Sequence, residues 1–487
     1  MKPSLFKLQI PDLVFISVLI IALASGRQML DLDSDIGRHL TLGNYMLNER
    51  LIPAHDLFSH TRAGLSRPPY EWMSQILFAL SNRLLGLDGD ILLTSIVLAL
   101  TFFLICKFAS RRSGTPMLSL IITFIAAGAA SIHWLPRPHT FTFLLLTIWI
   151  EYLEKLTRGE AVRLYTFPLL MLLWANLHGG FIFGILVWAA YFAGWLWETW
   201  RGRSNKSHGY DLLAIGVTSL ITTVVTPDLW RNWSAVLNNQ SAFILNRTIE
   251  TMRPNLLDIS ILPYTFLLLL TLLLYIFNWK NFKAAHLFLL AGLGILSLLM
   301  ARNIPLFAIA SAPILSEMAA GHLSKIKAWA QIEKRFSGFS PPSGSSIWPI
   351  TIVLLMTTYI ANFNFTNKHP IYRFDPVIFP VEAANFLEAN PPAGNMFNSF
   401  NWGGYLLYRL WPEQRVFIDG QTDFYGETLS REYVQVESLQ PGWENVFTKY
   451  DVEWVIVPHT GLLANMLVAK GWDILYQDDT TDILRKP

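Results

Sequence analysis

The stretch LVFISVLIIALASGRQMLDLDSDIGRHL, residues 13–40, contains the pattern that determines the fold. It begins with an apolar run and then places three carboxylates, Asp31, Asp33 and Asp35, just before Arg38 and His39. A bilayer core requires about 20 mostly apolar residues per helix, and charged groups are costly inside it. The stretch therefore predicts a first membrane span followed by a charged segment at the membrane edge. We expect this span to be retained, although ALAS at 22–25 has the small-residue pattern of a signal-peptide cleavage site.

The composition is that of an integral membrane protein. Of the 487 residues, 52% are hydrophobic and 15% are charged, and the mean hydropathy is +0.37. Soluble globular domains are about one-quarter charged. The net charge of +2 gives no support to nucleic-acid binding. The single cysteine, Cys106, lies in an apolar run and has no partner for an internal disulfide.

Eleven apolar stretches are predicted to form membrane-spanning helices. They lie at residues 11–30, 89–107, 117–134, 139–156, 164–177, 179–199, 211–227, 262–279, 284–300, 303–320 and 347–363. We therefore predict a polytopic α-helical membrane domain over residues 1–363, with a long first extracytoplasmic loop at 31–88.

The basic residues predict the orientation of this domain. Loops containing KFASRR, EKLTRGEAVR, RGRSNK, NWKNFK and KIKAWAQIEKR are rich in Lys and Arg, whereas the intervening turns LPRPH, NLHGG and ARN carry at most one such residue. Cytoplasmic loops carry the excess of Lys and Arg. We therefore expect a multi-pass protein of the inner (cytoplasmic) membrane, with a cytoplasmic N-terminus and residues 364–487 outside.

Residues 364–487 change pattern and predict a small extracytoplasmic α/β domain. FPVEAANFLEAN at 379–390 has helical spacing, whereas RVFID (415–419), EWVIVP (453–458) and WDILYQ (472–477) are typical of short strands. Asp419 and Asp423 follow the predicted strand RVFID, a common place for functional side chains in α/β domains. An Asx turn that closes DGQTD accounts for them as well.

Polar residues gather in the turns predicted to lie outside. Each of these positions also has a simpler structural interpretation. The aspartates can cap a helix, Arg137 can anchor at the headgroups, a tight turn accounts for NLHGG, and Arg302 can extend from a helix end. Taken together, five separate turns supply carboxylates, imidazoles and guanidiniums to the same side, which favours one shared site. The site residues are Asp33, Asp35 and His39 in the first loop, Arg137 and His139 in HWLPRPH, Asn176 and His178 in WANLHGG, and Arg302 in ARNIP. TPDLWRNW at 226–233 is the remaining one of the five turns.

These groups suit an anionic, lipid-linked substrate. Guanidiniums such as those of Arg137 and Arg302 bind phosphate oxygens in a bidentate manner. A nearby carboxylate can take a proton from an attacking hydroxyl. Alternatively, Asp33 and Asp35 can hold a divalent cation such as Mg²⁺ or Mn²⁺ through oxygen ligands. The sequence leaves the choice between base and metal ligand open.

Several motifs together resemble the GT-C superfamily of integral membrane glycosyltransferases, in particular bacterial polytopic members. The first is D-x-D-x-x-x-H-L-x-x-G, formed here by Asp33, Asp35, His39, Leu40 and Gly43. PYEW at 69–72 supplies Glu71, and NLHGG at 176–180 supplies Asn176 and His178. NWGGYLLYRL and VFIDGQTDFYG are similar to the same group. This chain departs from the pattern at IGR before His39, where the group often has aromatic residues.

The resemblance implies transfer of a hexosyl or pentosyl group from a polyprenyl-phosphate donor to a glycan, lipid or protein acceptor on the extracytoplasmic face. It gives the role of base or metal ligand to Asp33 or Asp35. We expect Asp35 to be the base, because His39 lies one helical turn later and can orient it. The remaining residues are expected to bind substrate: Glu71, Arg137, His139, Asn176, His178, Arg302, Asp419 and Asp423.

Two other classes of protein fit parts of the pattern. A non-catalytic membrane subunit that retains the scaffold and binds a lipid or partner protein predicts an acidic pair salt-bridged to Arg38 or Arg137. A lipid or sugar flippase requires polar residues along the spans, where this chain has few.

Overall fold

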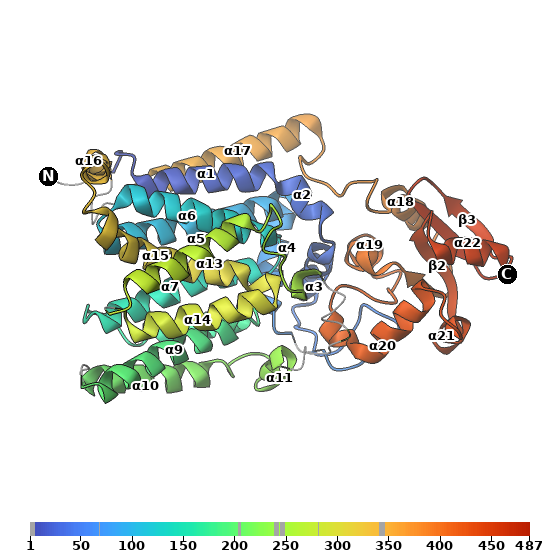
Figure 1. Cartoon of the computed structure of the whole chain (residues 1–487). Coiled ribbons are helices and arrows are strands. Elements are labelled where there is room, and N and C mark those ends of the chain that lie inside the picture. The colour runs from blue at the N-terminus through green and yellow to red at the C-terminus, as the bar shows by residue number, and fades with distance from the viewer. Residues whose placement is uncertain are drawn as a thin grey trace.

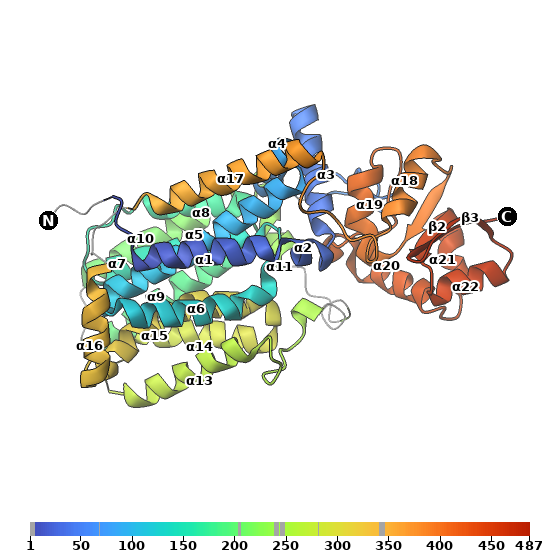
Figure 2. The same cartoon turned by 90° about the horizontal axis from the view of Figure 1, so that it is seen from above.

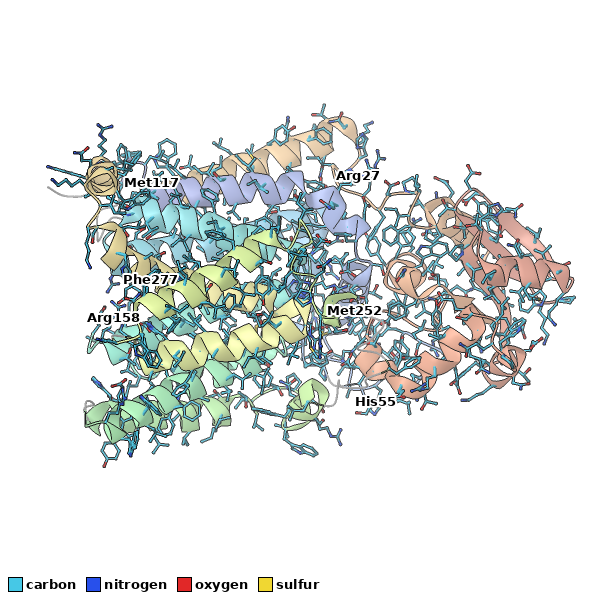
Figure 3. All side chains as sticks on the ribbon, viewed as in Figure 1. Arg27, His55, Met117, Arg158, Met252 and Phe277 are labelled. Atoms are coloured by element: carbon cyan, nitrogen blue, oxygen red, sulfur yellow. The ribbon has the colours of Figure 1, made fainter. Side chains whose placement is uncertain are left out.

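The computed structural model describes residues 5–67, 69–202, 206–237, 243, 249–280, 282–339 and 346–487. Figure 1 shows a helical bundle with a smaller domain packed at one end, hereafter the domain-facing end of the bundle. Helix α16 (Lys327–Phe336) lies at the opposite end in both views (Figures 1 and 2). Two loop positions also mark the ends: Met252 lies at the domain-facing end and Arg158 at the opposite end (Figure 3).

A helix occupies each of the eleven ranges predicted to span the membrane. Five helical segments of the described residues are long and apolar enough to cross a bilayer: Leu87–Ser113, Pro116–His133, Phe181–Trp200, Ala301–Leu323 and Trp348–Asn367. The chain is thus a multi-pass helical membrane protein, whereas the count of eleven spans stays a prediction. The helices are α1 (Ile10–Ala24), α5 (Leu87–Ser113), α6 (Pro116–Ala130), α7 (His139–Thr157), α8 (Thr166–Leu177), α9 (Phe181–Trp200), α10 (Lys206–Thr222), α13 (Leu262–Phe277), α14 (Ala284–Leu299), α15 (Ile304–Leu323) and α17 (Trp348–Asn367).

The first helix is shorter than predicted. The sequence predicts one span over 11–30, but α1 ends at Ala24 and a separate helix, α2 (Gly26–Asp31), follows. Ser25 at the junction has φ −86° and ψ 0°, outside the helical region. A Cβ at Gly26 would lie 2.6 Å from both Ile91 and Tyr372, so the chain turns where it passes closely against two other segments.

The core of the bundle is built around α15, which packs against α5, α6, α7, α13 and α14. Nearly all of its side chains between Ile304 and Ser316 are buried. Such a helix is apolar on all sides because it has neighbours on all sides. By contrast, α17 lies at the periphery and buries only Ile360.

The segment between α2 and α5 forms two more helices, α3 (Asp35–Glu49) and α4 (Trp72–Leu85), at the domain-facing end (Figure 1). The described part of the membrane domain also contains the short helices α11 (Arg231–Leu237), η1 (Ser131–His133), η2 (Ile249–Thr251), η3 (Ala301–Asn303) and η4 (Ser337–Phe339).

The small domain contains a four-stranded sheet in the order β1-β2-β4-β3. Its strands are β1 (Asn395–Asn398), β2 (Val452–Pro458), β3 (Asp473–Gln477) and β4 (Thr481–Arg485), and its helices are α18 (Val381–Ala389), η5 (Phe400–Trp402), α19 (Gly403–Leu410), α20 (Thr422–Glu437), α21 (Trp443–Lys449) and α22 (Leu462–Ala469). β1 and β2 are parallel, whereas β4 is antiparallel to both β2 and β3. The predicted α/β character and the strands at EWVIVP and WDILYQ are confirmed.

The predicted strand RVFID is wrong. Only Val416 makes a β-bridge, and its partner is Ser59 of the first loop. The amides of Phe417 and Ile418 instead face the side-chain oxygen of Asn398, at 2.8 and 3.4 Å. The apolar residues of this stretch are buried without strand pairing, because Phe417 and Ile418 pack into the core of the small domain. The sequence pattern also missed β1 and β4.

Glycines bring the small domain into close contact with the first loop. A Cβ at Gly37 of α3 would lie 2.3 Å from the carbonyl oxygen of Gly404, and one at Gly404 would lie 2.2 Å from that of Ser34. The start of α3 therefore packs directly on α19. This contact places the first-loop aspartates beside residues of the small domain.

Candidate active site

Asp33 and Asp35 lie at the start of α3 and share a guanidinium. Asp33 Oδ1 accepts the backbone N–H of Asp35 at 3.0 Å, as the capping interpretation predicts. Arg137, from the turn before α7, donates from Nε to Asp33 and lies 3.4 Å from Asp35. Its third partner is Glu250, at 3.3 Å. Burial lowers the pKa of Arg137, but the surrounding carboxylates outweigh it and raise the pKa well above its usual value.

A second cluster surrounds Glu71, which lies just before α4. Its two carboxylate oxygens lie 3.8 Å from His178 Nε2 and 3.8 Å from His39 Nδ1, and Arg38 is 4.0 Å away. Burial raises the pKa of Glu71 to about 7, with Arg38 opposing the shift. Burial and the nearby Arg302 lower the pKa of His178 to about 3, so this imidazole is neutral.

His39 faces Glu71 rather than Asp35. Its pKa is lowered by burial and then by Arg38, so this ring is neutral as well. Arg38 lies 3.4 Å from His39 Nε2. The expected pairing of Asp35 with His39 is thus replaced by contacts of Asp35 with Arg137 and of His39 with Glu71, because the two side chains leave α3 toward different neighbours.

The PYEW and NLHGG motifs meet in space. Trp72 Nε1 donates to Asn176 Oδ1 at 2.8 Å, beside the Glu71–His178 contact. Asn176 also donates to the carbonyl oxygens of Leu172 and Val225 at 2.9 and 3.0 Å. Its amide is used to connect α8 with α4, and the tight-turn interpretation therefore describes it well.

His139 and Arg302 both lie near His178 and have different roles. His139 Nε2 is 2.9 Å from the carbonyl oxygen of His133, and its ring centroid is 6.5 Å from that of His178. Within the described residues, Arg302 has no carboxylate within 4.0 Å, although its charge lowers the pKa of His178. Among the residues that the structure describes, the Arg302 guanidinium therefore lies close to the site without forming an ion pair.

Asp419 and Asp423 lie at different depths. Asp419 is fully buried and accepts from the Gln421 amide at 2.8 Å and from the Tyr425 hydroxyl at 2.9 Å, which is the Asx-turn arrangement. Arg38 lies 3.8 Å from it. Asp423 accepts from the hydroxyl of Tyr70 at 2.9 Å, and burial raises the pKa of Asp423. Asp423 thus borders the Glu71 cluster, whereas Asp419 supports Arg38.

The sequence missed several residues of this site. Arg67 forms a 2.6 Å ion pair with Asp56 and donates to Gln421 Oε1 at 2.8 Å. Gly420 leaves the space that Asp35 occupies, since a Cβ there would lie 1.9 Å from Asp35 Oδ1. Gly420 and Gln421 belong to the VFIDGQTDFYG motif, whereas Arg67 and Asp56 lacked a sequence signal.

The arrangement does not favour a metal ion at the aspartates. Across the described parts of the chain, no group of three or more His, Cys, Asp and Glu residues is arranged to hold one. Arg137 contacts both Asp33 and Asp35, and its positive charge offsets part of theirs. A divalent cation at these two carboxylates would have to displace that guanidinium.

No protein-family model matches the sequence, and no curated protein matches it. Solved structures do match. The oligosaccharyltransferase AglB of Archaeoglobus fulgidus, in complex with an inhibitory peptide and a dolichol-phosphate, has a TM-score of 0.62 at 12% identity, covering 91% of this chain and 69% of that chain. The apo form of the Archaeoglobus fulgidus enzyme has a TM-score of 0.61 at 11% identity over the same shares. ArnT from Cupriavidus metallidurans in the apo state has a TM-score of 0.48 at 13% identity, covering 97% of both chains. This chain therefore shares the fold of the Archaeoglobus fulgidus oligosaccharyltransferase AglB.

Proposed function

We propose that this protein transfers a hexosyl or pentosyl group from a polyprenyl-phosphate donor to a hydroxyl of a glycan, lipid or protein acceptor. The reaction takes place at the domain-facing end of the bundle, on the extracytoplasmic side of the inner membrane. The fold supports the reaction class, since AglB, which shares it, is an oligosaccharyltransferase that has been seen with dolichol-phosphate. The bias of basic residues between loops supports the orientation.

The observation that carries the proposal is the position of Arg302. Arg137 is already neutralised by three carboxylates. Arg302 has none within 4.0 Å among the described residues, and its charge acts on His178 and, at longer range, on Glu250 and Asp423. A guanidinium without a carboxylate partner is suited to the phosphate of a donor. The reacting carbon would then lie between this phosphate and the carboxylates of the site.

An apolar groove next to the site supports a lipid-linked donor. It has a volume of about 490 Å³ and is lined by Asn176, Ile221, Val224, Val225, Thr226, Pro227 and Leu229. The groove lies at the end of α10, and Asn176 connects it to Trp72 and hence to the Glu71 cluster. A prenyl chain in this groove would place its phosphate near the polar residues.

The test is binding of polyprenyl phosphate to the purified full chain in lipid nanodiscs. Each charge-assisted hydrogen bond is worth about 1.5–3 kcal/mol, so Arg302→Ala should weaken binding roughly 10- to 100-fold. Arg163→Ala, an exposed arginine at the other end of the bundle, is the control and should bind as wild type does. Incubation with a panel of polyprenyl-phosphate hexoses and pentoses and a membrane extract should release polyprenyl phosphate. Wild-type protein that neither binds the lipid nor releases it would contradict the proposal.

A second function is favoured by one observation. The ion pairs of Arg137 with Asp33 and Asp35 are those expected of a non-catalytic subunit that retains the scaffold. Such a protein would bind polyprenyl phosphate or a partner without releasing it from a sugar donor. Lipid binding with no turnover of any donor in the panel would favour this alternative.

A further inference from the structure

We propose that Glu71, rather than Asp33 or Asp35, is the general base that takes the proton from the acceptor hydroxyl. This inference rests on the proposed function and assigns its chemistry to one side chain. In the step, an acceptor oxygen attacks the anomeric carbon and forms the new C–O bond. The bond between that carbon and the phosphate oxygen breaks, and its electron pair leaves with polyprenyl phosphate. The hydroxyl proton moves to the Glu71 carboxylate.

The geometry around His178 directs an N–H group at Glu71. His178 Nδ1 accepts the backbone N–H of Gly180 at 3.0 Å. Trp174 Nε1 donates to Thr142 Oγ1 at 2.9 Å, which leaves the Thr142 hydroxyl to donate to the same Nδ1 at 2.8 Å. With Nδ1 an acceptor, the proton of the neutral ring is on Nε2, and Nε2 faces one Glu71 oxygen at 3.8 Å.

His39 lies beside the other Glu71 oxygen, with its Nδ1 3.8 Å away. Donors contact both of its ring nitrogens at 3.4 Å, the Arg38 guanidinium at Nε2 and the Gln75 side-chain amide at Nδ1. Burial and Arg38 lower the pKa of His39, so this ring is neutral. Two neutral imidazoles therefore lie beside the Glu71 carboxylate, one at each oxygen.

The distances leave Glu71 free to react. At 3.8 Å both imidazole nitrogens are beyond hydrogen-bond distance, and within the described residues the Glu71 carboxylate has no closer hydrogen-bond donor. Glu71 also lines a small cavity together with Arg38, Tyr70 and Gln75. An acceptor hydroxyl can thus bond to this carboxylate directly.

Asp33 and Asp35 lack this freedom. Asp33 uses one oxygen for the Asp35 amide and the other for Arg137. Asp35 lies 3.4 Å from the same guanidinium. An oxygen that already binds an N–H group or a guanidinium has to give up that contact before it can accept a substrate proton. These two aspartates therefore keep Arg137 in place, and they are positioning residues for the reaction.

The surroundings of Glu71 place its pKa within the pH range in which transfer can be assayed. Burial raises its pKa to about 7, Arg38 lowers it, and Asp423 and Asp35 raise it. Because a base acts in its ionised form, transfer should increase with pH, with a midpoint near 7. The groups that face Glu71 are Arg38 and His39 of α3, Asp35 at its start, Tyr70, Arg137, His178 and Asp423 of α20.

The first test measures sugar transfer by Glu71→Gln in the full chain, with a polyprenyl-phosphate sugar that wild type uses. Loss of a general base typically costs about 10²- to 10⁴-fold in rate, so Glu71→Gln should lose transfer to that extent. Its affinity for polyprenyl phosphate should stay within a few-fold of wild type, which shows that the fold is intact. Glu413→Gln, an exposed carboxylate of the small domain, should transfer as wild type does. Transfer by Glu71→Gln above one-tenth of the wild-type rate would overturn the inference.

The second test reads the pH profile. Asp423→Asn removes a negative charge that raises the pKa of Glu71, so the midpoint of transfer should move to lower pH. Asp35→Asn should keep a pH-dependent rise, with its midpoint also lowered. A midpoint that stays at the wild-type pH in Asp423→Asn would count against Glu71 as the base. Wild type with no donor turnover at any pH would instead refute the proposed function itself.

Discussion

Replacing Arg67 by Ala should weaken the contact between the first loop and the small domain, so that the two separate more often. Arg67 is 4% exposed and forms a 2.6 Å ion pair with Asp56, whose side chain is fully buried. It also donates to Gln421 Oε1 at 2.8 Å and lies 3.7 Å from Asp419. The substitution leaves two buried carboxylates with less positive charge nearby.

The expected cost is about 3–5 kcal/mol, the usual penalty for removing one partner of a buried ion pair. At 1.36 kcal/mol per factor of ten, this is roughly a 10²- to 10⁴-fold increase in opening. The guanidinium also lies 4.8 Å from the ring centroid of Phe424, and this cation–π contact is lost as well.

Hydrogen exchange followed by mass spectrometry measures this opening. The reporter amides connect the first loop to the small domain. Val416 N–H donates to the carbonyl oxygen of Phe58, and His60 N–H donates to that of Val416, at 3.1 Å each. Arg485→Ala is the control, because its ion pair with Asp473 is exposed and contributes little. If Arg67→Ala protects the Val416 and His60 amides as well as the Arg485→Ala control does, Arg67 does not stabilise the contact between the first loop and the small domain.

Three further substitutions test other parts of the structure. Gly420→Ala should strongly reduce transfer without unfolding the small domain, because its Cβ would lie 1.9 Å from Asp35 Oδ1. Arg137→Gln should lower the thermal midpoint, and Mg²⁺ should restore part of it, because three carboxylates then lack their shared cation and offer oxygen ligands. Glu154→Gln should destabilise the bundle by about 3–5 kcal/mol, seen as a lower thermal midpoint with unchanged affinity for polyprenyl phosphate. Glu154 is buried at the end of the bundle away from the site and accepts from His286 at 2.5 Å.

Matched controls separate these effects from general damage. Gly321→Ala adds the same methyl group where nothing lies within 4 Å of it, so transfer should be unchanged. Glu160→Gln removes a partly exposed carboxylate near the same end of the bundle as Glu154, and its thermal midpoint should stay at the wild-type value. If either control shows the same loss as its partner, or if Mg²⁺ stabilises wild type as much as Arg137→Gln, the corresponding reasoning fails.

The sequence predicted the positions of the long helices because an apolar run of sufficient length has one stable form in a bilayer. It also placed the polar residues of separate turns at one end, and the structure brings Glu71, His178 and His39 together there. The pattern failed where burial came from outside the local segment. RVFID resembles a strand, but Phe417 and Ile418 are buried in the core of the small domain and only Val416 pairs, with Ser59 of the first loop.

The sequence by itself therefore determined the membrane class, the ends of most helices, and which residue types lie at the domain-facing end, because hydrophobic periodicity and charge act locally along the chain. Only the tertiary structure decided which carboxylate is free. Arg137 binds Asp33 and Asp35, whereas two neutral imidazoles from distant segments face Glu71. A carboxylate's basicity depends on the charges and N–H groups that surround it, and long-range packing alone brings these together.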